Sequence, residues 1–229
     1  MTIESDIEKK FEEAIKKFSS GNDEKRLSGF HVSSMSYDCK RNIWYNIKLQ
    51  SGKENSIDGI YRMWIGSKLH ETPITENHEL KMKTKRNSYI LSGTLDEIVE
   101  IDGKKYLIDK KFQQYLPMKM LEHHRIQVMY YAVLLKDLKD IDVDGVGIVY
   151  FPPYMKQQTD KAGNPIPRMK VVVAQVTPQI LEEYRKKLYD FVDETSDKLK
   201  KNELPDKNAS WYCQYCPYKE MCDIDSKGD

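Results

Sequence analysis

The segment from Ser92 to Phe112, SGTLDEIVEIDGKKYLIDKKF, constrains the fold of this chain more than any other. Two runs rich in Ile, Val, Leu and Tyr flank Asp102-Gly103, the dipeptide that best fits a tight type I′ turn. The segment is therefore predicted to be a β-hairpin. If its loop consists of those two residues, Ile101 sits opposite Lys104, and this fixes the register of both strands.

The same register places Asp96 directly opposite Asp109. Lys111 shares a face with Asp109, because side chains alternate along a strand, whereas Lys110 points to the other face. Two facing carboxylates repel one another and weaken a sheet, so a chain that places them there usually needs a cation between them. The alternative is an exposed sheet edge that carries scattered charges.

The composition is that of a chain with a sizeable core and a charged surface. The 229 residues suffice for one large domain, and 32% of them are charged. No apolar run approaches the roughly 20 residues that span a bilayer, and residues 1–17 predict a charged amphipathic helix rather than a signal peptide. We therefore expect a cytoplasmic protein without a membrane partner. The net charge of +1 does not by itself indicate nucleic-acid binding.

Hydrophobic periodicity predicts helices interleaved with strands. Ser33 or Ser34 is expected to cap the second helix, Pro117 to open a long one, and Thr177-Pro178 to start the last. The strand over 79–85 is expected beside the hairpin. Since no repeat or domain linker is evident, we predict a single mixed α/β domain over residues 1–229. The expected helices cover about 3–18, 33–47, 57–70, 117–138 and 178–202, and the other strands 146–151 and 169–176.

The cysteines carry the second signal. The chain has four, Cys39, Cys213, Cys216 and Cys222, the last three spaced C-x2-C-x5-C. This pattern suits one tetrahedral four-thiolate site holding zinc or an iron–sulfur cluster, and it would tie residues 205–229 to the second helix. Two disulfides are the alternative, which a cytoplasmic chain disfavours. The presence of only one C-x2-C pair favours iron over zinc weakly.

Three further groups carry little weight alone. Gln127 and Tyr131, four residues apart, share a face of the long helix, although such a pair is most often at the surface. His70 ends an amphipathic helix, where a lone His is more often structural than a ligand. His123 and His124 diverge by about 100° on a helix and do not converge on one ion, so we expect both at the surface.

Taken in order, these pieces form a pattern. The set His70, Gly93-Thr94-Leu95-Asp96, Asp109-Lys110-Lys111 and Gln127-x3-Tyr131 resembles the PD-(D/E)xK nuclease superfamily, and more closely its RecB-type branch. With the four cysteines, the chain is similar to the iron–sulfur RecB-like exonucleases, of which the CRISPR-associated type best matches its size. The resemblance spans Ser33 to Cys222. It departs mildly at Lys110, where the family often has an aromatic or small residue.

The resemblance implies a restriction-endonuclease-like fold, in which a central mixed β-sheet is flanked by helices and a C-terminal cysteine cluster is tied to an N-terminal helix. It also implies that Asp96, Asp109, the backbone carbonyl of Lys110 and His70 bind Mg²⁺ or Mn²⁺. Carboxylates are the hard oxygen ligands that these ions prefer, and a His nitrogen suits Mn²⁺ better than Mg²⁺.

The remaining roles follow from the same resemblance. Lys111 would position the attacking water or neutralise charge in the transition state, and Gln127 and Tyr131 would orient the site and the DNA backbone. The four cysteines, Cys39, Cys213, Cys216 and Cys222, would hold a 4Fe–4S cluster with a mainly structural duty.

The expected function is a metal-dependent exonuclease acting on single-stranded DNA or overhangs, in CRISPR spacer acquisition with the integrase complex as partner. The alternatives are end resection in viral or plasmid recombination, a non-catalytic iron–sulfur or zinc DNA-binding module, and a zinc-stapled interaction protein. A degenerate binder is expected to have lost Asp96, Asp109 or Lys111, and all three are present.

Overall fold

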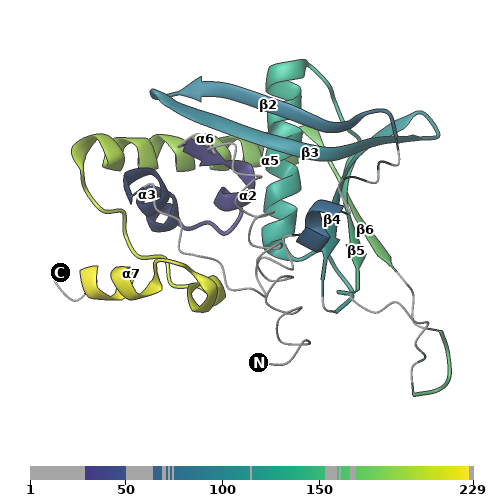
Figure 1. Cartoon of the computed structure of the whole chain (residues 1–229). Coiled ribbons are helices and arrows are strands. Elements are labelled where there is room, and N and C mark those ends of the chain that lie inside the picture. Colours follow the sequence, from purple (N-terminus) through teal and green to yellow (C-terminus); the bar gives the residue numbers. More distant parts are fainter. Residues whose placement is uncertain are drawn as a thin grey trace, which may run out of the picture.

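The computed structural model places the sheet at the centre of the described chain (Figure 1). The helix expected over 3–18, the greater part of the helix expected over 57–70, and His70 itself lie outside the described residues. The structure describes residues 29–49, 64–68, 71, 73, 75–113, 115–152, 159, 161–165 and 169–226.

The predicted mixed sheet is confirmed, with six strands. The strands run in the order β1-β3-β4-β5-β6, and β2 pairs with β3 off this path. The β1/β3 and β4/β5 pairs are parallel and the other pairs are antiparallel. The strands are β1 (Gly29–His31), β2 (His78–Arg86), β3 (Tyr89–Ile101), β4 (Lys104–Phe112), β5 (Gly145–Phe151) and β6 (Lys170–Gln175).

The hairpin has the predicted turn and register. Asp102 and Gly103 have φ of +52° and +74°, the positive values that a type I′ turn requires. The ladder pairs Ile101 with Lys104 and continues to Glu97 and Ile108. The strand expected over 79–85 is β2, and it lies along β3 as predicted.

The sheet forks along β3. On one edge, β2 pairs with β3 from Tyr89 to Glu97. On the other edge, β1 pairs with residues 90–92 and β4 with residues 97–101. Residues 93–96 therefore lie in the gap between β1 and β4, and the last of them is Asp96.

Besides residues 64–68, which are helical, the described chain has six helical segments, and two of these differ from prediction. The helix expected from Ser33 or Ser34 is broken in two, because Asp38 adopts a left-handed φ of +54°. The long helix begins at Glu122 rather than at Pro117, since Leu121 is extended and its N–H donates to the Tyr150 hydroxyl at 3.1 Å. The segments are α2 (Val32–Met35), α3 (Lys40–Leu49), α5 (Glu122–Lys139), α6 (Pro178–Lys201), the 3₁₀ helix η1 (Trp211–Tyr215) and α7 (Lys219–Asp225).

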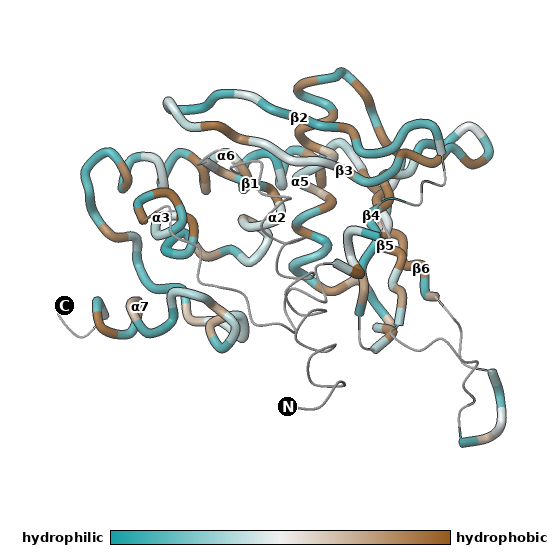
Figure 2. Tube along the Cα trace, in the orientation of Figure 1, coloured by the Kyte–Doolittle hydropathy of each residue, from teal (hydrophilic) through white to brown (hydrophobic). Residues whose placement is uncertain are grey.

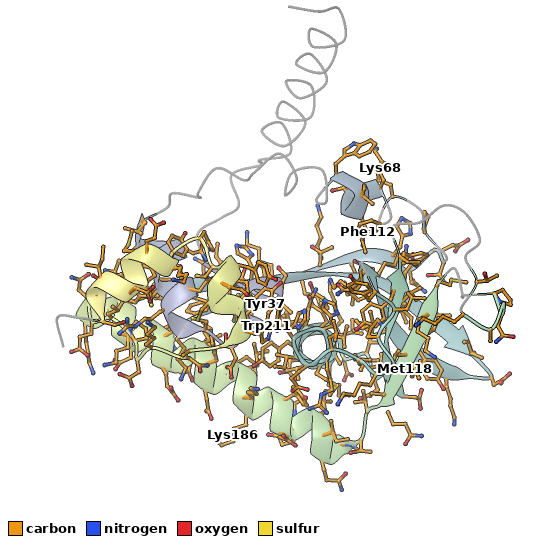
Figure 3. All side chains as sticks on the ribbon, turned by 90° about the horizontal axis from the view of Figure 1, so that it is seen from below. Tyr37, Lys68, Phe112, Met118, Lys186 and Trp211 are labelled. Carbon is orange, nitrogen blue, oxygen red and sulfur yellow. The ribbon has the colours of Figure 1, made fainter. Side chains whose placement is uncertain are left out.

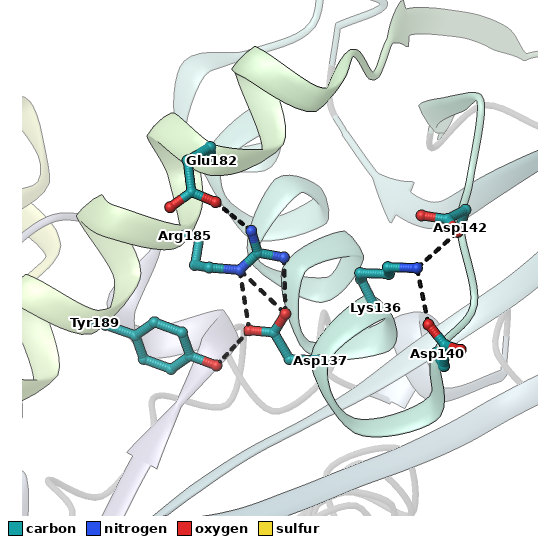
Figure 4. Close-up of polar contacts among 7 residues, drawn as sticks. All are labelled: Lys136, Asp137, Asp140, Asp142, Glu182, Arg185 and Tyr189. Atoms are coloured by element: carbon teal, nitrogen blue, oxygen red, sulfur yellow. Dashed lines mark hydrogen bonds and ion pairs between the residues drawn. The ribbon is translucent and has the colours of Figure 1, made fainter.

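Helix α6 starts as predicted. The Thr177 hydroxyl accepts a hydrogen bond from the Ile180 N–H, Pro178 stands in the first turn, and the left-handed Asn202 ends the helix. Helix α6 packs against α5. Arg185 on α6 donates to Asp137 on α5 at 2.8 Å (Figure 4). The Tyr189 hydroxyl donates to the same carboxylate at 2.7 Å, so a small polar network fixes the crossing of the two helices.

Helix α5 connects the parallel strands β4 and β5 and packs in the core. Its residues from Ile126 to Leu135 are all buried, and the hydrophobic colour in Figure 2 runs along α5 and β5. The helix is covered by the sheet on one side and by α6 on another, which explains burial around most of its circumference. In the described part of the chain, no helix is both long and apolar enough to cross a bilayer.

Candidate active site

Asp96 stands at the fork of the sheet. Its carboxylate accepts a hydrogen bond from the backbone N–H of Lys110 at 2.7 Å. This side-chain contact lies one position beyond the last ladder pair, Glu97 with Ile108. The carboxylate therefore sits where β4 leaves β3, and only 6% of the Asp96 residue is exposed.

Asp109 lies beside it on β4 and is 1% exposed. Its Oδ2 is 2.7 Å from the Lys111 ammonium, and its Oδ1 accepts from the Gln127 amide at 3.2 Å. The same amide donates to the Tyr131 hydroxyl at 3.1 Å. The shared helix face predicted for Gln127 and Tyr131 is confirmed, but both side chains are buried rather than at the surface.

Both carboxylates affect the pKa of Lys111. Burial alone would lower the pKa of its ammonium. The nearby negative charges, Asp109 first and then Asp96, act in the opposite direction, and the net effect raises the pKa above its usual value. The Lys111 side chain is 22% exposed, against 2% for that of Asp109. The Lys111 side chain therefore reaches the surface in part, whereas the carboxylate with which its ammonium pairs does not.

Lys110 points away from this site, as the alternation of the strand predicts. Its ammonium lies 2.7 Å from Glu97 on the opposite face of the hairpin, and the two side chains are 3% and 0% exposed. Thr75 donates a second hydrogen bond to Glu97. The ammonium of Lys110 is therefore committed to a buried ion pair on the other face and adds no charge to the site.

Gly93 makes room for the Tyr131 ring. A Cβ at this position would lie 2.6 Å from Tyr131 Cε1 and 3.1 Å from Val32 Cγ2. Only glycine lets β3 approach α5 this closely, so the backbone at residue 93 sets the position of Tyr131. Through Tyr131 it also sets the position of Gln127.

The donor set fits a divalent cation that prefers oxygen. Two buried carboxylates, each oriented by an N–H donor, are ligands suited to Mg²⁺ or Mn²⁺. His70, the expected nitrogen ligand, lies outside the described residues. Among the residues that the structure describes, no three His, Cys, Asp or Glu side chains are gathered around a single point.

The four cysteines line one cavity between α3 and the C-terminal segment. None of the four forms a disulfide, and all lie in the described part of the chain. Burial raises the pKa of the Cys39 thiol, the backbone N–H of Asn42 acts the other way, and the three other cysteines raise it further. The four cysteines, far apart in the sequence, therefore line the same cavity, although their sulfurs do not gather around a single point.

N–H donors surround the cysteine sulfurs. The Asn42 amide donates to the sulfur of Cys216 at 3.4 Å, and the Ser210 N–H donates to Cys213 at 3.4 Å. The Arg41 guanidinium donates to the sulfur of Cys222 at 3.6 Å. Such bonds stabilise negative charge on sulfur, so the surroundings of these three cysteines suit thiolates.

The buried contact between His124 and Tyr150 was not predicted from the sequence. His124 was expected at the surface but is 7% exposed, and its ring bonds the buried Tyr150 hydroxyl at 3.1 Å. Burial first, then His123 and Lys111, lower the pKa of His124 to about 2, so it is neutral at physiological pH. The argument that adjacent histidines diverge still holds. It does not imply exposure on a helix that is covered on several sides.

Two carboxylates and an ammonium group therefore lie together where two strands part. Residues 37–223 match the PD-(D/E)XK nuclease superfamily, and the chain belongs to that superfamily. The nuclease class expected from the residue pattern is therefore confirmed.

Solved structures are similar to the chain, and that of SSO0001 shares its fold. The crystal structure of SSO0001 has a TM-score of 0.54 at 16% identity and covers 95% of this chain and 96% of its own. A phage-related exonuclease from Haemophilus somnus 129PT has a TM-score of 0.45 at 12% identity, covering 72% of this chain and 82% of its own. No curated protein sequence matches the chain significantly.

Replacing Lys110 by Met should destabilise the fold, because it leaves the Glu97 carboxylate buried without its ammonium partner. We expect the free energy of unfolding to fall by about 3–5 kcal/mol, measured by urea denaturation. The matched control, Lys104→Met on the exposed part of the same strand, should change it by less than about 0.5 kcal/mol. Equal urea midpoints for Lys110→Met and wild type would contradict a structural role for the pair.

Gly93→Ala should impair cleavage without unfolding the protein, since the new methyl group displaces Tyr131 and with it the amide that orients Asp109. A displacement of about 1 Å in such a site can lower the rate about 100-fold. Initial rates of DNA cleavage and thermal melting curves should be measured together. Gly66→Ala is the control, because a Cβ there meets no atom within 4 Å. A wild-type rate for Gly93→Ala would exclude this positioning.

Proposed function

We propose that the protein is a metal-dependent DNA exonuclease that acts on single strands or on duplex ends with single-stranded overhangs. One observation carries the proposal. Asp96 and Asp109, from the two strands that part at the fork, lie with the Lys111 ammonium in one largely buried site. In this proposal residues 1–229 form one nuclease unit, and residues 205–229 are its cluster-binding tail.

In the mechanism, Asp96 and Asp109 would hold the ion, and the Lys110 carbonyl and His70 would be its further ligands. A bound Mg²⁺ or Mn²⁺ would polarise the scissile phosphate and lower the pKa of the attacking water. The Lys110 N–H and the Gln127 amide keep the two carboxylates in place. Because this orientation exists before substrate binds, it costs no reorganisation during the reaction.

Lys111 acts on the substrate side. Its ammonium, 2.7 Å from Asp109, positions the water or neutralises the charge that develops on the phosphate oxygens. Tyr131 holds the Gln127 amide and helps to orient the DNA backbone. Each of these groups comes from an element packed in the core, so the site is rigid.

The four cysteines, in the same proposal, hold a 4Fe–4S cluster that fastens the tail to α3. The shared cavity and the N–H donors around the sulfurs support a thiolate site. The single C-x2-C pair favours iron over zinc. A zinc-stapled module is the alternative, and the two differ in colour and metal content.

The biological setting we propose is the trimming of spacer precursors in CRISPR adaptation, in the cytoplasm and beside the integrase complex. The order of the site residues and cysteines along the chain supports it. End resection in viral or plasmid recombination uses the same chemistry. A non-catalytic DNA-binding module is disfavoured, since Asp96, Asp109 and Lys111 are all present and in contact with site groups.

Asp96→Asn and Lys111→Ala should each lower cleavage about 100-fold or more, because Asp96→Asn removes a charged ligand of the ion and Lys111→Ala removes the ammonium that faces the reacting phosphate. End-labelled single-stranded and double-stranded DNA should be incubated with the protein and Mg²⁺, Mn²⁺ or a chelator. The control, Asp102→Asn, removes a carboxylate from the turn of the same hairpin and should cleave normally. Cleavage retained in both site variants, or in chelator, would refute the proposed active site.

Cys213→Ser should remove a ligand from the tail and lower both the metal content and the melting temperature. The wild-type protein should be brown and contain iron, measured by visible absorbance and elemental analysis. Gln214→Ser, one residue away and exposed, is the control and should behave as wild type. A colourless wild type that contains zinc would show that the site holds zinc and no iron–sulfur cluster. An unchanged melting curve for Cys213→Ser would exclude a role of the cysteines in fastening the tail.

A further inference from the structure

Five aromatic rings form a contiguous surface between the proposed active site and the cysteine cavity. We call this set the aromatic platform. Two elements meet in it: η1 from the tail, and the start of α5, with the short connection between α2 and α3 beside them. Its members are Tyr37, His123, Trp211, Tyr212 and Tyr215.

Tyr37 is the centre of the platform. Its ring stacks on Tyr212 with centroids 4.0 Å apart and planes 12° from parallel, and on His123 at 5.4 Å and 18°. Trp211 contacts His123 at 5.0 Å and meets Tyr37 edge-on at 6.1 Å. Figure 3 shows Tyr37 and Trp211 side by side where the C-terminal segment approaches α5.

The outer rings of the platform face solvent. Trp211 is 55% exposed and Tyr215 is 69% exposed, and their rings lie 6.2 Å apart at 68°. Single exposed apolar residues are ordinary, but adjoining large rings backed by a stacked aromatic layer indicate a binding surface. The backing layer holds the exposed rings in place before any ligand arrives.

The inner rings of the platform lie near Lys111. Burial raises the pKa of the Tyr37 hydroxyl, and the Lys111 ammonium acts in the opposite direction. Burial lowers the pKa of His123, and the same ammonium lowers it further. Contacts give the same placement: the His123 ring centroid lies 4.1 Å from that of His124, His124 bonds the Tyr150 hydroxyl, and Tyr150 on β5 pairs with Lys111 on β4. The platform therefore extends from the active site to the surface.

We infer that the aromatic platform binds the unpaired bases of a single DNA strand that leads to the active site. An unpaired base has π-faces free to stack on Trp and Tyr, whereas the bases inside a duplex already stack on one another. Stacking of this kind tolerates any sequence, because every base has such a face. The inference rests on the proposed nuclease function and names single strands as the substrate class.

The cysteine site has a second duty in this arrangement. Trp211, Tyr212 and Tyr215 lie in the same 3₁₀ helix as Cys213, and Cys216 follows it directly. A metal centre on these cysteines would hold three rings of the platform against Tyr37 and α5. The tail would then serve substrate binding, as well as closure of the fold.

The test measures binding separately from cleavage. The full-length protein carries Asp96→Asn so that DNA stays intact, and fluorescence anisotropy gives its affinity for a labelled oligo-dT strand and for a blunt duplex. Trp211→Ala and Tyr215→Ala should each weaken oligo-dT binding about 5- to 100-fold and leave duplex binding unchanged. Trp211→Phe should retain most of the affinity because it keeps a ring.

Ile224→Ala is the matched control, since Ile224 is 69% exposed on α7 in the same tail and carries no ring. Visible absorbance and melting curves check that each variant keeps its metal centre and fold. Unchanged oligo-dT binding in both Trp211→Ala and Tyr215→Ala would overturn the inference, as would an equal loss for oligo-dT and duplex in folded variants. Failure of the proposed function is a different result, namely a wild type that cleaves no DNA although the ring variants weaken oligo-dT binding.

Discussion

The structure depends on how a sheet accommodates two buried carboxylates side by side. Facing acids destabilise a strand pair, and here the ladder between β3 and β4 stops one position before them. The Lys110 N–H bonds the Asp96 carboxylate at this point, so a side chain takes the place of a backbone acceptor. The fork that results opens the edge of β3 between β1 and β4. The feature that weakens the sheet locally is therefore the feature that creates the site.

A site in the core requires that every polar group near it has a partner. On one face of the hairpin, Asp109 is held by Lys111 and Gln127. On the other face, Lys110 and Glu97 form a buried ion pair. Breaking such a buried pair destabilises a fold strongly. Because side chains alternate along a strand, the adjacent lysines Lys110 and Lys111 point to opposite faces, one to the ion pair and one to the site. Helix α5 contributes both to the core and to the site, since its buried apolar residues fill the core and it also carries Gln127.

The sequence was sufficient to predict those elements whose structure depends on neighbouring residues alone. The Asp-Gly turn fixed the register of the hairpin, and the Thr-Pro start fixed α6. The start of α5 could not be predicted, because Leu121 is held extended by the Tyr150 hydroxyl, a contact across the fold. The burial of His124 was missed for a related reason. A helix covered by a sheet and by another helix has no polar stripe to mark its exposed side.

The C-terminal tail shows why a thiolate site belongs in this fold. Neither η1 nor α7 contains a buried residue, so apolar burial contributes little to their stability. Polar contacts hold part of the tail, since Arg41 of α3 donates to the Pro205 carbonyl at 2.5 Å and to the Ser226 hydroxyl at 2.9 Å. Stacking of Tyr212 on Tyr37 holds another part. Ordering a segment of this length costs conformational entropy that a few such contacts offset only in part. The proposed four-cysteine centre, reaching back to Cys39, would add stabilisation, because metal binding to such a site is folding free energy.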